Sequence, residues 1–297
     1  MSIKNINYKV NMIWGPKGDV GKSTIASYIA TRFAKEGYIV GLIELDRYIS
    51  SIPYILGIED MNGRSLSKAI TSESEKDILR NFVLHPEYDL YIMSLNINED
   101  KKITSLLRYP EKRIEEIIKI ARSKFDLVFI DCPSNYIEQG FIVPLKLDVD
   151  RMICVIDNDI AKVAGMKLYD RFFYETEVNF GDVITVINKD KGILIENMIK
   201  KVVSEDLKVL RSREIFKIPL NERFIKAKNE GVNLADVVPV SKLERNISKS
   251  INDIYNHILD FEEKTTTQDN FLEKKDKKGL FKKIFSRNKR LGGEIND

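Results

Sequence analysis

The first fifty residues alternate between apolar runs and polar segments in a pattern that predicts a strand, a loop, a helix and a second strand. The apolar-rich run Tyr8–Trp14 is followed by the polar stretch GPKGDVGKST. Apolar residues then recur at helical spacing, at Ile25, Ile29 and Phe33, and Gly37 ends this pattern before the buried-type strand YIVGLIEL. This order predicts a βαβ unit, in which a helix connects two parallel strands.

Further apolar runs of strand length recur along the chain, mostly separated by helical stretches. They are Leu90–Ser94, Leu127–Ile130, Met152–Ile156, Val183–Ile187 and Ile215–Ile218. Strands that alternate with helices favour an α/β fold, with a mostly parallel twisted sheet and helices on both faces. A last helix is predicted to start at Ser241, which has capping-box spacing with Glu244. Its apolar stripe consists of Leu243, Ile247, Ile251, Ile254 and Ile258.

Composition excludes several classes of protein. With 297 residues, of which 43% are hydrophobic, the chain is long enough to bury a sizeable core and is not disordered throughout. The sequence contains no run of eighteen apolar residues, so we expect no membrane-spanning helix. The N-terminus lacks the features of a signal peptide. Cys132 and Cys154 alone make neither a disulfide framework nor a cysteine-rich metal site. We therefore expect a cytoplasmic protein.

The net charge of +3 is unevenly distributed. Residues 274–290 contain nine basic residues and one acid, a net charge of +8, so the rest of the chain carries −5. A polar, threonine-rich stretch, EEKTTTQDN, precedes this basic segment. We therefore predict one α/β domain over residues 1–262, a linker over 263–273 and a basic tail over 274–297.

The polar stretch after the first predicted strand has the composition of a phosphate-binding loop. Glycines let backbone N–H groups turn inward around phosphate oxygens, and the following helix adds the positive end of its dipole. Lys22 is expected to reach the β- and γ-phosphates, and the Ser23 hydroxyl to bind Mg²⁺. The predicted nucleotide-binding residues here are Gly18, Asp19, Val20, Gly21, Lys22, Ser23 and Thr24. The alternative is a chance turn rich in glycine and lysine.

The order of residues in this loop departs from the common pattern G-x4-G-K-[ST]. Pro16 occupies the first glycine position, and Lys17 lies two residues after Gly15. The stretch KGDVGKST resembles the deviant Walker A motif, K-G-G-x-G-K-[ST], of the MinD/ParA family of P-loop ATPases. The resemblance implies ATP and Mg²⁺ as cofactors and an ATP-dependent homodimer in which Lys17 reaches the phosphates of the partner. Asp19 replaces a glycine of the motif, and aspartate tolerates a left-handed backbone better than most residues.

Two further segments extend the resemblance around the phosphates. In GLIELDRY, where the family has a strand ending in D-x-D, the acidic positions are Glu44 and Asp46. The resemblance implies that Asp46 positions the attacking water and is catalytic together with the two lysines of the loop. The alternative is that Asp46 only caps the next segment. In FDLVFIDCPSN an apolar strand ends in Asp131, to which the resemblance assigns a role in holding Mg²⁺.

Two later segments resemble the part of the family site that binds the base. VITVINK resembles the strand whose last asparagine recognises adenine, which is Asn188 here. IPLNERFIKAKNEG resembles a segment whose proline, here Pro219, lines the adenine pocket; alone, such a proline is equally a strand stop. The resemblance covers residues 8–262 and implies slow ATP hydrolysis by in-line attack of water. Its output would be an assembly state rather than a metabolite.

The basic tail has the pattern of a short amphipathic helix. In KKGLFKKIFSRNKRL the large apolar residues fall on one side of a helix, opposite the lysines, which is typical of a helix in an anionic membrane interface. The tail resembles the C-terminal membrane-targeting sequence of MinD-type proteins. The residues predicted to contact the membrane are Leu280, Phe281, Lys282, Lys283, Ile284 and Phe285. The alternatives are a solvated basic tail, non-specific contact with nucleic acid, or a helix that docks on a partner protein.

These features together predict a switch ATPase that is peripheral on the inner face of the cell membrane and positions or regulates a cellular assembly through an unknown partner protein. One alternative is a ParA-like ATPase that binds DNA and partitions it, which the acidic body disfavours. Another is a scaffold that barely hydrolyses nucleotide, as in pilus or secretion systems, which Pro16, Asp19 and Glu44 keep open. Iron–sulfur relatives need a cysteine pair at the dimer axis, and no such pair is present in the sequence.

Overall fold

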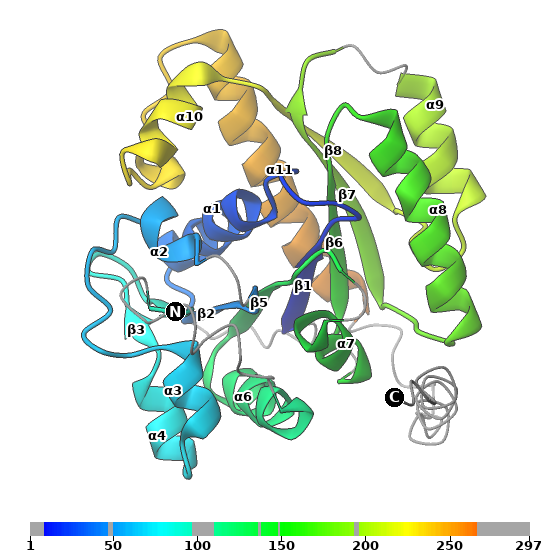
Figure 1. The fold of residues 1–297 in the computed structure, drawn as a ribbon. Coiled ribbons are helices and arrows are strands. Elements are labelled where there is room, and N and C mark those ends of the chain that lie inside the picture. Colours follow the sequence, from blue (N-terminus) through cyan, green and yellow to red (C-terminus); the bar gives the residue numbers. More distant parts are fainter. Residues whose placement is uncertain are drawn as a thin grey trace, which may run out of the picture.

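The computed structural model describes residues 9–46, 50–96, 110–135, 138–147, 149–192 and 196–265. The strands are β1 (Val10–Trp14), β2 (Val40–Glu44), β3 (Val83–Leu84), β4 (Leu90–Met93), β5 (Leu127–Asp131), β6 (Arg151–Ile156), β7 (Asp182–Asp190) and β8 (Glu214–Pro219). They form one sheet in the order β3-β4-β2-β5-β1-β6-β7-β8, in which only β3 is antiparallel to its neighbour (Figure 1). The predicted α/β fold with a mostly parallel sheet is confirmed.

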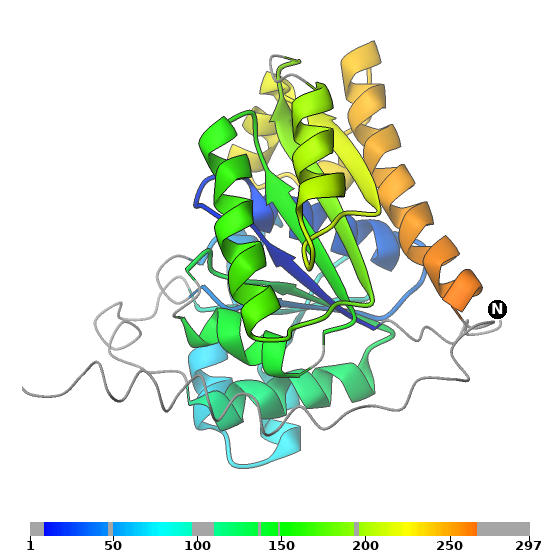
Figure 2. The ribbon, with the colours of Figure 1, turned by 90° about the vertical axis from the view of Figure 1, so that its right-hand side faces the viewer.

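Helices cover both faces of this sheet (Figures 1 and 2). They are α1 (Lys22–Lys35), α2 (Ile52–Ile55), α3 (Leu66–Thr71), α4 (Glu75–Arg80), α6 (Glu111–Lys124), α7 (Gln139–Lys146), α8 (Ile160–Glu175), α9 (Glu196–Lys201), α10 (Glu222–Asn229) and α11 (Lys242–Thr265). A short π-helical segment follows α9 at Val202–Asp206, and a 3₁₀ turn follows α10 at Leu234–Asp236. Each face of the sheet therefore has its own hydrophobic core, as the near-continuous apolar strands predict.

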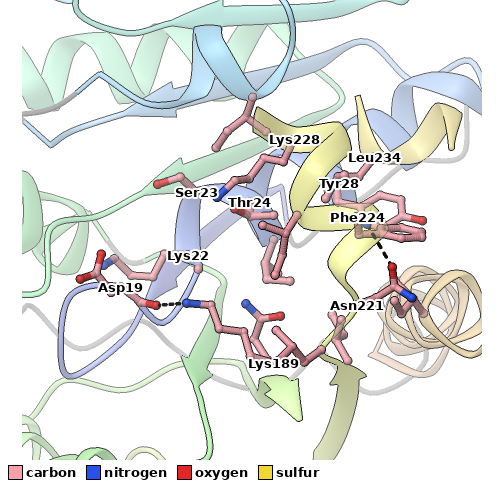
Figure 3. A pocket seen from close by; sticks show the side chains of 18 of the residues that line it. Asp19, Lys22, Ser23, Thr24, Tyr28, Lys189, Asn221, Phe224, Lys228 and Leu234 are labelled. Carbon is pink, nitrogen blue, oxygen red and sulfur yellow. Dashed lines mark hydrogen bonds between the residues drawn. The ribbon is translucent and has the colours of Figure 1, made fainter. Parts of the chain in front are cut away.

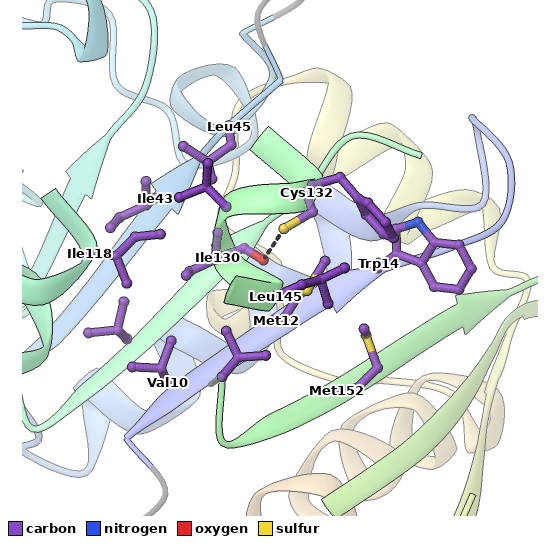
Figure 4. Close-up of a cluster of buried hydrophobic side chains, with 14 of the residues drawn as sticks. Val10, Met12, Trp14, Ile43, Leu45, Ile118, Ile130, Cys132, Leu145 and Met152 are labelled. Atoms are coloured by element: carbon purple, nitrogen blue, oxygen red, sulfur yellow. Dashed lines mark hydrogen bonds between the residues drawn. The ribbon is translucent and has the colours of Figure 1, made fainter. Parts of the chain in front are cut away.

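The alternation of side chains along β1 separates the two cores. Val10, Met12 and Trp14 contact the layer that contains α6, α7 and α8, whereas Ile13 contacts the layer of α1 and α11. Figure 4 shows the first of these cores, in which Trp14, the only tryptophan of the chain, is completely buried. The first strand is therefore the centre of the molecule, and the loop that follows it is held by packing on both sides.

The last helix begins as its sequence predicts. The Ser241 hydroxyl accepts a hydrogen bond from the Glu244 N–H, and the Glu244 carboxylate accepts one from the Ser241 N–H, each at 3.2 Å. The four isoleucines of the predicted stripe are buried, but Leu243 is 40% exposed, so its assignment to the stripe is wrong. Leu243 lies in the first turn of α11. The helix continues to Thr265, inside the segment predicted as linker.

Residues 266–297 lie outside the described residues, and with them the six tail positions predicted to contact a membrane. Among the residues that the structure describes, no helix combines the length and the apolar character needed to cross a bilayer.

The carboxyl ends of the parallel strands gather the predicted site residues at one edge of the sheet, as in other open α/β sheets. The loop 15–21 leaves β1 there, Asp46 follows β2, and Asp131 ends β5. The strand register sets Asp131 beside Ile13 on one side and Glu44 on the other. Residues far apart in the sequence are thus brought together by strand order rather than by local structure.

Candidate functional site

The loop between β1 and α1 has a backbone that few residues other than glycine adopt. Gly21, which caps α1, has a φ of +92°, and Asp19 has a φ of +62°. The expectation that aspartate would adopt the left-handed conformation in place of glycine is therefore confirmed. A Cβ atom on Gly15 would lie 2.3 Å from the backbone oxygen of Val155 in β6, so the start of the loop lies directly against the sheet.

Beside this loop lies a cavity of about 420 Å³ between α1, α10, β7 and the segment after β2 (Figure 3). It brings together most of the residues predicted from the sequence. These are Gly18, Asp19, Gly21, Lys22, Ser23, Thr24, Asp46, Asn188 and Pro219. Phe224, which matches an apolar position of the family segment around Pro219, also lines the cavity. The sequence did not single out other lining residues, among them Tyr28, Ser51, Lys189, Leu220, Asn221, Lys228 and Leu234.

The end of β7 is tied to the loop by two side chains. The amide nitrogen of Asn188 donates a hydrogen bond to the backbone oxygen of Val20 at 2.8 Å, and the Val20 side chain is buried. The ammonium of Lys189 donates to the backbone oxygen of Asp19 at 2.6 Å (Figure 3). This hydrogen bond fixes the Asn188 side chain through its nitrogen, and the carbonyl oxygen is the atom of the amide that can accept a hydrogen bond from a ligand.

Lys22 lines the cavity, whereas Asp131 is buried beside Lys22 and Ser23 and does not line it. The Lys22 ammonium donates a hydrogen bond to the Ser134 hydroxyl at 2.8 Å. Burial raises the pKa of Asp131 to about 6, although the positive charge of Lys22 and a hydrogen bond with Ser23 act in the opposite direction. Its Oδ1 atom is buried and has no hydrogen-bond partner among the described residues.

This orphaned carboxylate oxygen beside a serine hydroxyl fits a magnesium site. Mg²⁺ prefers oxygen ligands and is commonly held by one or two protein groups, with water and phosphate oxygens completing its coordination. Ser23 and Asp131 supply these groups, and a bound cation would offset the charge that burial disfavours on Asp131.

The two remaining residues assigned a catalytic role differ in their surroundings. Asp46 lines the cavity, and its negative charge contributes to the raised pKa of Asp131, so the two carboxyl groups are neighbours. Lys17 is exposed and does not line the cavity, although it belongs to the same loop as Lys22. A role for Lys17 in the cavity of its own chain is therefore not supported by its position.

Glu44, which replaces the first acid of D-x-D, is buried behind the cavity. Its carboxylate accepts hydrogen bonds from the backbone N–H and the hydroxyl of Ser51, at 2.9 and 2.7 Å, and from the Ser94 hydroxyl. Burial and the nearby charge of Asp131 raise its pKa to about 7. Since Ser51 lines the cavity, Glu44 fixes part of the cavity wall from behind.

The opposite end of the cavity is mostly apolar. Tyr28 of α1 and Phe224 of α10 have ring centroids 6.4 Å apart, and Leu234 and Ile247 lie around them. Asn221 caps α10, and its side-chain oxygen accepts a hydrogen bond from the Phe224 N–H at 3.0 Å. An asparagine directly before a helical stretch is a recognisable cap signal, so the start of α10 was predictable from the sequence even though its place in the cavity was not.

The cysteines take no part in this site. Cys132 and Cys154 are both buried, and burial raises the pKa of each thiol. Cys132 packs in the core, where its thiol donates to the backbone oxygen of Ile130 (Figure 4). Within the described part of the chain, no group of three or more histidine, cysteine or acidic side chains is arranged to hold a metal ion.

Comparison with known proteins agrees with this geometry. A model of the ParA family, described as "NUBPL iron-transfer P-loop NTPase", matches residues 5–259. The chain belongs to the MinD/ParA family of P-loop NTPases. The septum site-determining protein MinD of Thermotoga maritima is 26% identical over 257 residues, which cover 82% of this chain and 87% of that protein.

Solved structures of MinD/ParA proteins have the same fold. A ParA family ATPase from Chlorobium tepidum TLS superposes with a TM-score of 0.69 at 17% identity, covering 84% of this chain and 99% of that one. The septum site-determining protein MinD from Pyrococcus horikoshii OT3, complexed with Mg-ADP, superposes with a TM-score of 0.64 at 17% identity, covering 83% and 95%. Members of the family are ATPases whose cofactors are ATP and Mg²⁺, as predicted from the loop.

Proposed function

We propose that this MinD/ParA-family protein is a slow switch ATPase that dimerises with ATP and binds an anionic membrane surface through its tail. In this role it positions or regulates a cellular assembly, such as one at the division site, through a partner protein. The observation that carries the proposal is the division of the loop: Lys22 and Ser23 line the cavity, whereas Lys17 of the same loop is exposed. One lysine is thus available to the chain's own nucleotide, and the other to a second copy of the chain.

Each side chain of the cavity has a defined task in this proposal. Lys22 neutralises charge on the β- and γ-phosphates, and Asp46 holds the attacking water in line with the γ-phosphate. Ser23 and Asp131 hold Mg²⁺, which neutralises charge on the phosphate oxygens when bound. Asn188 accepts a hydrogen bond from the adenine amine through its carbonyl oxygen, while Pro219 and Phe224 enclose the base.

Low turnover is consistent with the charge of the loop. Asp19 places a carboxylate where the family motif has glycine, next to the phosphates that the cavity would hold. Its charge opposes the additional negative charge of ATP, so we expect weaker binding and slower hydrolysis than with glycine at this position. A slow step suits a switch, because the lifetime of the ATP-bound dimer then sets how long the protein stays assembled.

Membrane binding rests on the sequence of the tail. One short amphipathic helix binds a membrane weakly, and each basic residue near an anionic surface adds about 1 kcal/mol. Two tails joined in a dimer bind much more tightly, because the second tail binds at a high effective concentration. ATP would therefore control membrane binding through dimerisation.

The test is sedimentation with vesicles that contain phosphatidylglycerol, with ATP or with ADP, and with neutral phosphatidylcholine vesicles for comparison. The full chain is expected to pellet with anionic vesicles and ATP, whereas a chain ending at Thr265 stays in the supernatant. Phe281→Ser is expected to abolish pelleting, and Phe271→Ser, a matched change outside the predicted apolar face, is expected to retain it.

Two outcomes would contradict this proposal. A full chain that stays in the supernatant under every condition contradicts membrane binding, and ATP-dependent retention on DNA by the same preparation would favour the ParA-like alternative. An ATPase rate equal to that of a Lys22→Ala variant would contradict hydrolysis and favour a scaffold that only holds nucleotide.

A further inference from the structure

Ser134, three residues after the end of β5, is the meeting point of three elements. Its hydroxyl accepts the hydrogen bond from the Lys22 ammonium at 2.8 Å. Its backbone oxygen accepts one from the Tyr169 hydroxyl of α8 at 2.8 Å and one from the Trp14 indole N–H at 3.4 Å. A carbonyl oxygen has two lone pairs, so both hydrogen bonds are compatible with one acceptor.

The contact between Lys22 and Ser134 competes with the phosphates. A serine hydroxyl is a neutral acceptor, whereas a phosphate oxygen forms a charge-assisted and stronger hydrogen bond with an ammonium. Because Lys22 lines the cavity, nucleotide phosphates placed there draw its ammonium away from Ser134. Ser134 then loses the contact that ties its side chain to the start of α1.

The other two contacts hold Ser134 to the core. Trp14 is completely buried, and its ring centroid lies 4.6 Å from that of Tyr169 and 5.7 Å from that of Phe141. The polar atoms of Trp14 and Tyr169 both point to the same carbonyl oxygen at the rim of this aromatic cluster. A displacement of Ser134 therefore changes the surroundings of the indole and of the tyrosine hydroxyl together.

Tyr169 also reaches the outer surface of α8. Together with Leu168, Arg171, Phe172 and Glu175 it lines a second cavity, of about 280 Å³, on the outer side of that helix. Leu168 is 68% exposed there. The same tyrosine thus contacts Ser134 with its hydroxyl and borders this second cavity. The two cavities have no lining residue in common.

We propose that Ser134 and Tyr169 couple occupancy of the phosphate site to the outer face of α8. Phosphates take Lys22 from Ser134, the backbone oxygen of Ser134 shifts, and the Tyr169 hydroxyl transmits this shift to α8. Ser134 and Tyr169 are positioning residues in this scheme, since neither needs to touch the nucleotide. The inference rests on ATP binding in the proposed function, and adds a route by which binding changes a surface elsewhere on the protein.

The experiment uses the full chain with the Mg²⁺ complex of a non-hydrolysable ATP analogue. Trp14 is the only tryptophan, so its fluorescence reports the surroundings of the Ser134 carbonyl directly. Backbone hydrogen exchange over α8 reports whether the change reaches that helix. Nucleotide affinity is measured separately by calorimetry. In the wild-type protein we expect the analogue to change both the fluorescence of Trp14 and the exchange of α8.

Tyr169→Phe removes only the hydroxyl, and its matched control is Tyr174→Phe, which changes an exposed tyrosine of the same helix. We expect Tyr169→Phe to bind the analogue within about twofold of wild type and to keep the Trp14 response, but to lose the exchange response of α8. The Tyr174→Phe control is expected to keep both responses.

Ser134→Ala tests the other end of the coupling. In this variant Lys22 does not have to break a hydrogen bond with residue 134 when it binds phosphate. We therefore expect nucleotide affinity to rise about two- to tenfold, the range of one hydrogen bond. We also expect the fluorescence response of Trp14 to shrink. Ser134→Thr keeps the hydroxyl and should restore wild-type affinity, which a purely structural role of Ser134 does not predict.

An unchanged α8 response in Tyr169→Phe would overturn the proposal, and so would a wild-type protein that binds the analogue with no change at Trp14 or α8. A wild-type protein that fails to bind the analogue in calorimetry would contradict ATP binding itself, and this inference with it. The two kinds of failure are therefore distinguishable.

Discussion

The two ends of the cavity proposed to bind nucleotide, called here the phosphate end and the base end, are built in different ways. The phosphate end comes largely from one short segment, Gly18–Thr24, of which all residues except the buried Val20 line the cavity, together with Asp46, which follows β2. Asp131, at the end of the neighbouring strand β5, is buried beside this segment. The base end comes from side chains scattered over the sequence. They are Tyr28, Asn188, Pro219, Leu220, Asn221, Phe224, Lys228, Leu234 and Ile247.

This difference follows from what each end would bind. Phosphate oxygens need inward-pointing N–H groups and a fixed ammonium, which only a narrow set of backbone conformations provides, so the phosphate end leaves a compact motif in the sequence. A base needs flat apolar surfaces and one or two polar atoms, which many side chains supply. The phosphate end is therefore constrained by local sequence, and the base end by the fold.

The largest expected effect comes from removing the ammonium of the phosphate end. Lys22→Ala should lower the hydrolysis rate by about 100- to 1000-fold, because one preorganised charged donor to the transferred phosphate is lost. Its affinity for ATP should fall about tenfold or more, whereas its affinity for adenosine should stay near wild type. Calorimetry with both ligands and a phosphate-release assay check this, and an equal loss of adenosine binding would refute the separation of the two ends.

The sequence predicted the fold well wherever a segment is both long and apolar. Of the eight strands that the structure describes, seven were expected, and the one missed, Val83–Leu84, has two residues and no periodicity to detect. Leu243 was assigned to the apolar stripe of the last helix on spacing alone, and it is 40% exposed in the structure. Helical spacing identifies the apolar side of a helix, whereas the burial of each residue on that side depends on how far the neighbouring elements extend.

The residues that line the cavity were also predicted only in part. The loop residues followed from the motif, whereas Asn188 and Pro219 followed only from a family resemblance. Tyr28 and Lys228 line the same cavity because α10 lies beside α1, as the 6.4 Å between the ring centroids of Tyr28 and Phe224 shows. No local pattern in the sequence marks such residues as lining a cavity.

The next largest effect concerns pH and belongs to the phosphate end. Glu44 has a pKa raised to about 7, so between pH about 4.5 and 7 the folded protein holds a proton that the unfolded chain releases. The free energy of unfolding therefore falls as pH rises through this window, by up to about 3 kcal/mol from this group. Glu44→Gln, which cannot titrate, should flatten the dependence of the melting temperature on pH between 5 and 7.5.

The comparison for this prediction is the wild-type protein in the same buffers without nucleotide. Asp131, whose pKa is raised to about 6, contributes a slope of the same sign to both proteins, so only the difference between them reports Glu44. Identical pH profiles for the two proteins would mean that Glu44 is charged in the fold throughout this range.

Gly21 lies where the two ends meet, and its substitution should disturb both by a smaller amount. A Cβ atom at this position would lie 2.2 Å from the amide nitrogen of Asn188, and the φ of +92° is unfavourable for alanine. Gly21→Ala should lower the free energy of unfolding by about 1–2 kcal/mol and weaken adenosine binding by displacing Asn188 from Val20. Urea unfolding with Gly18→Ala as control checks the first part, because a Cβ on Gly18 meets no atom within 4 Å. Equal stability of the two variants would contradict the steric argument.

The smallest effect tests whether the base end contributes charge to the phosphate end. Lys228 lines the cavity from α10, and Figure 3 shows its side chain directed across the mouth toward the side of Ser23 and Thr24. No ion-pair partner of Lys228 occurs among the residues that the structure describes, whereas Lys226 on the same helix lies 3.8 Å from Glu230. Lys228→Ala should weaken ATP binding about two- to fivefold at low salt and less at high salt, with Lys226→Ala unchanged. An equal loss in both variants would show that α10 acts through general surface charge, and the two ends would then be electrostatically separate.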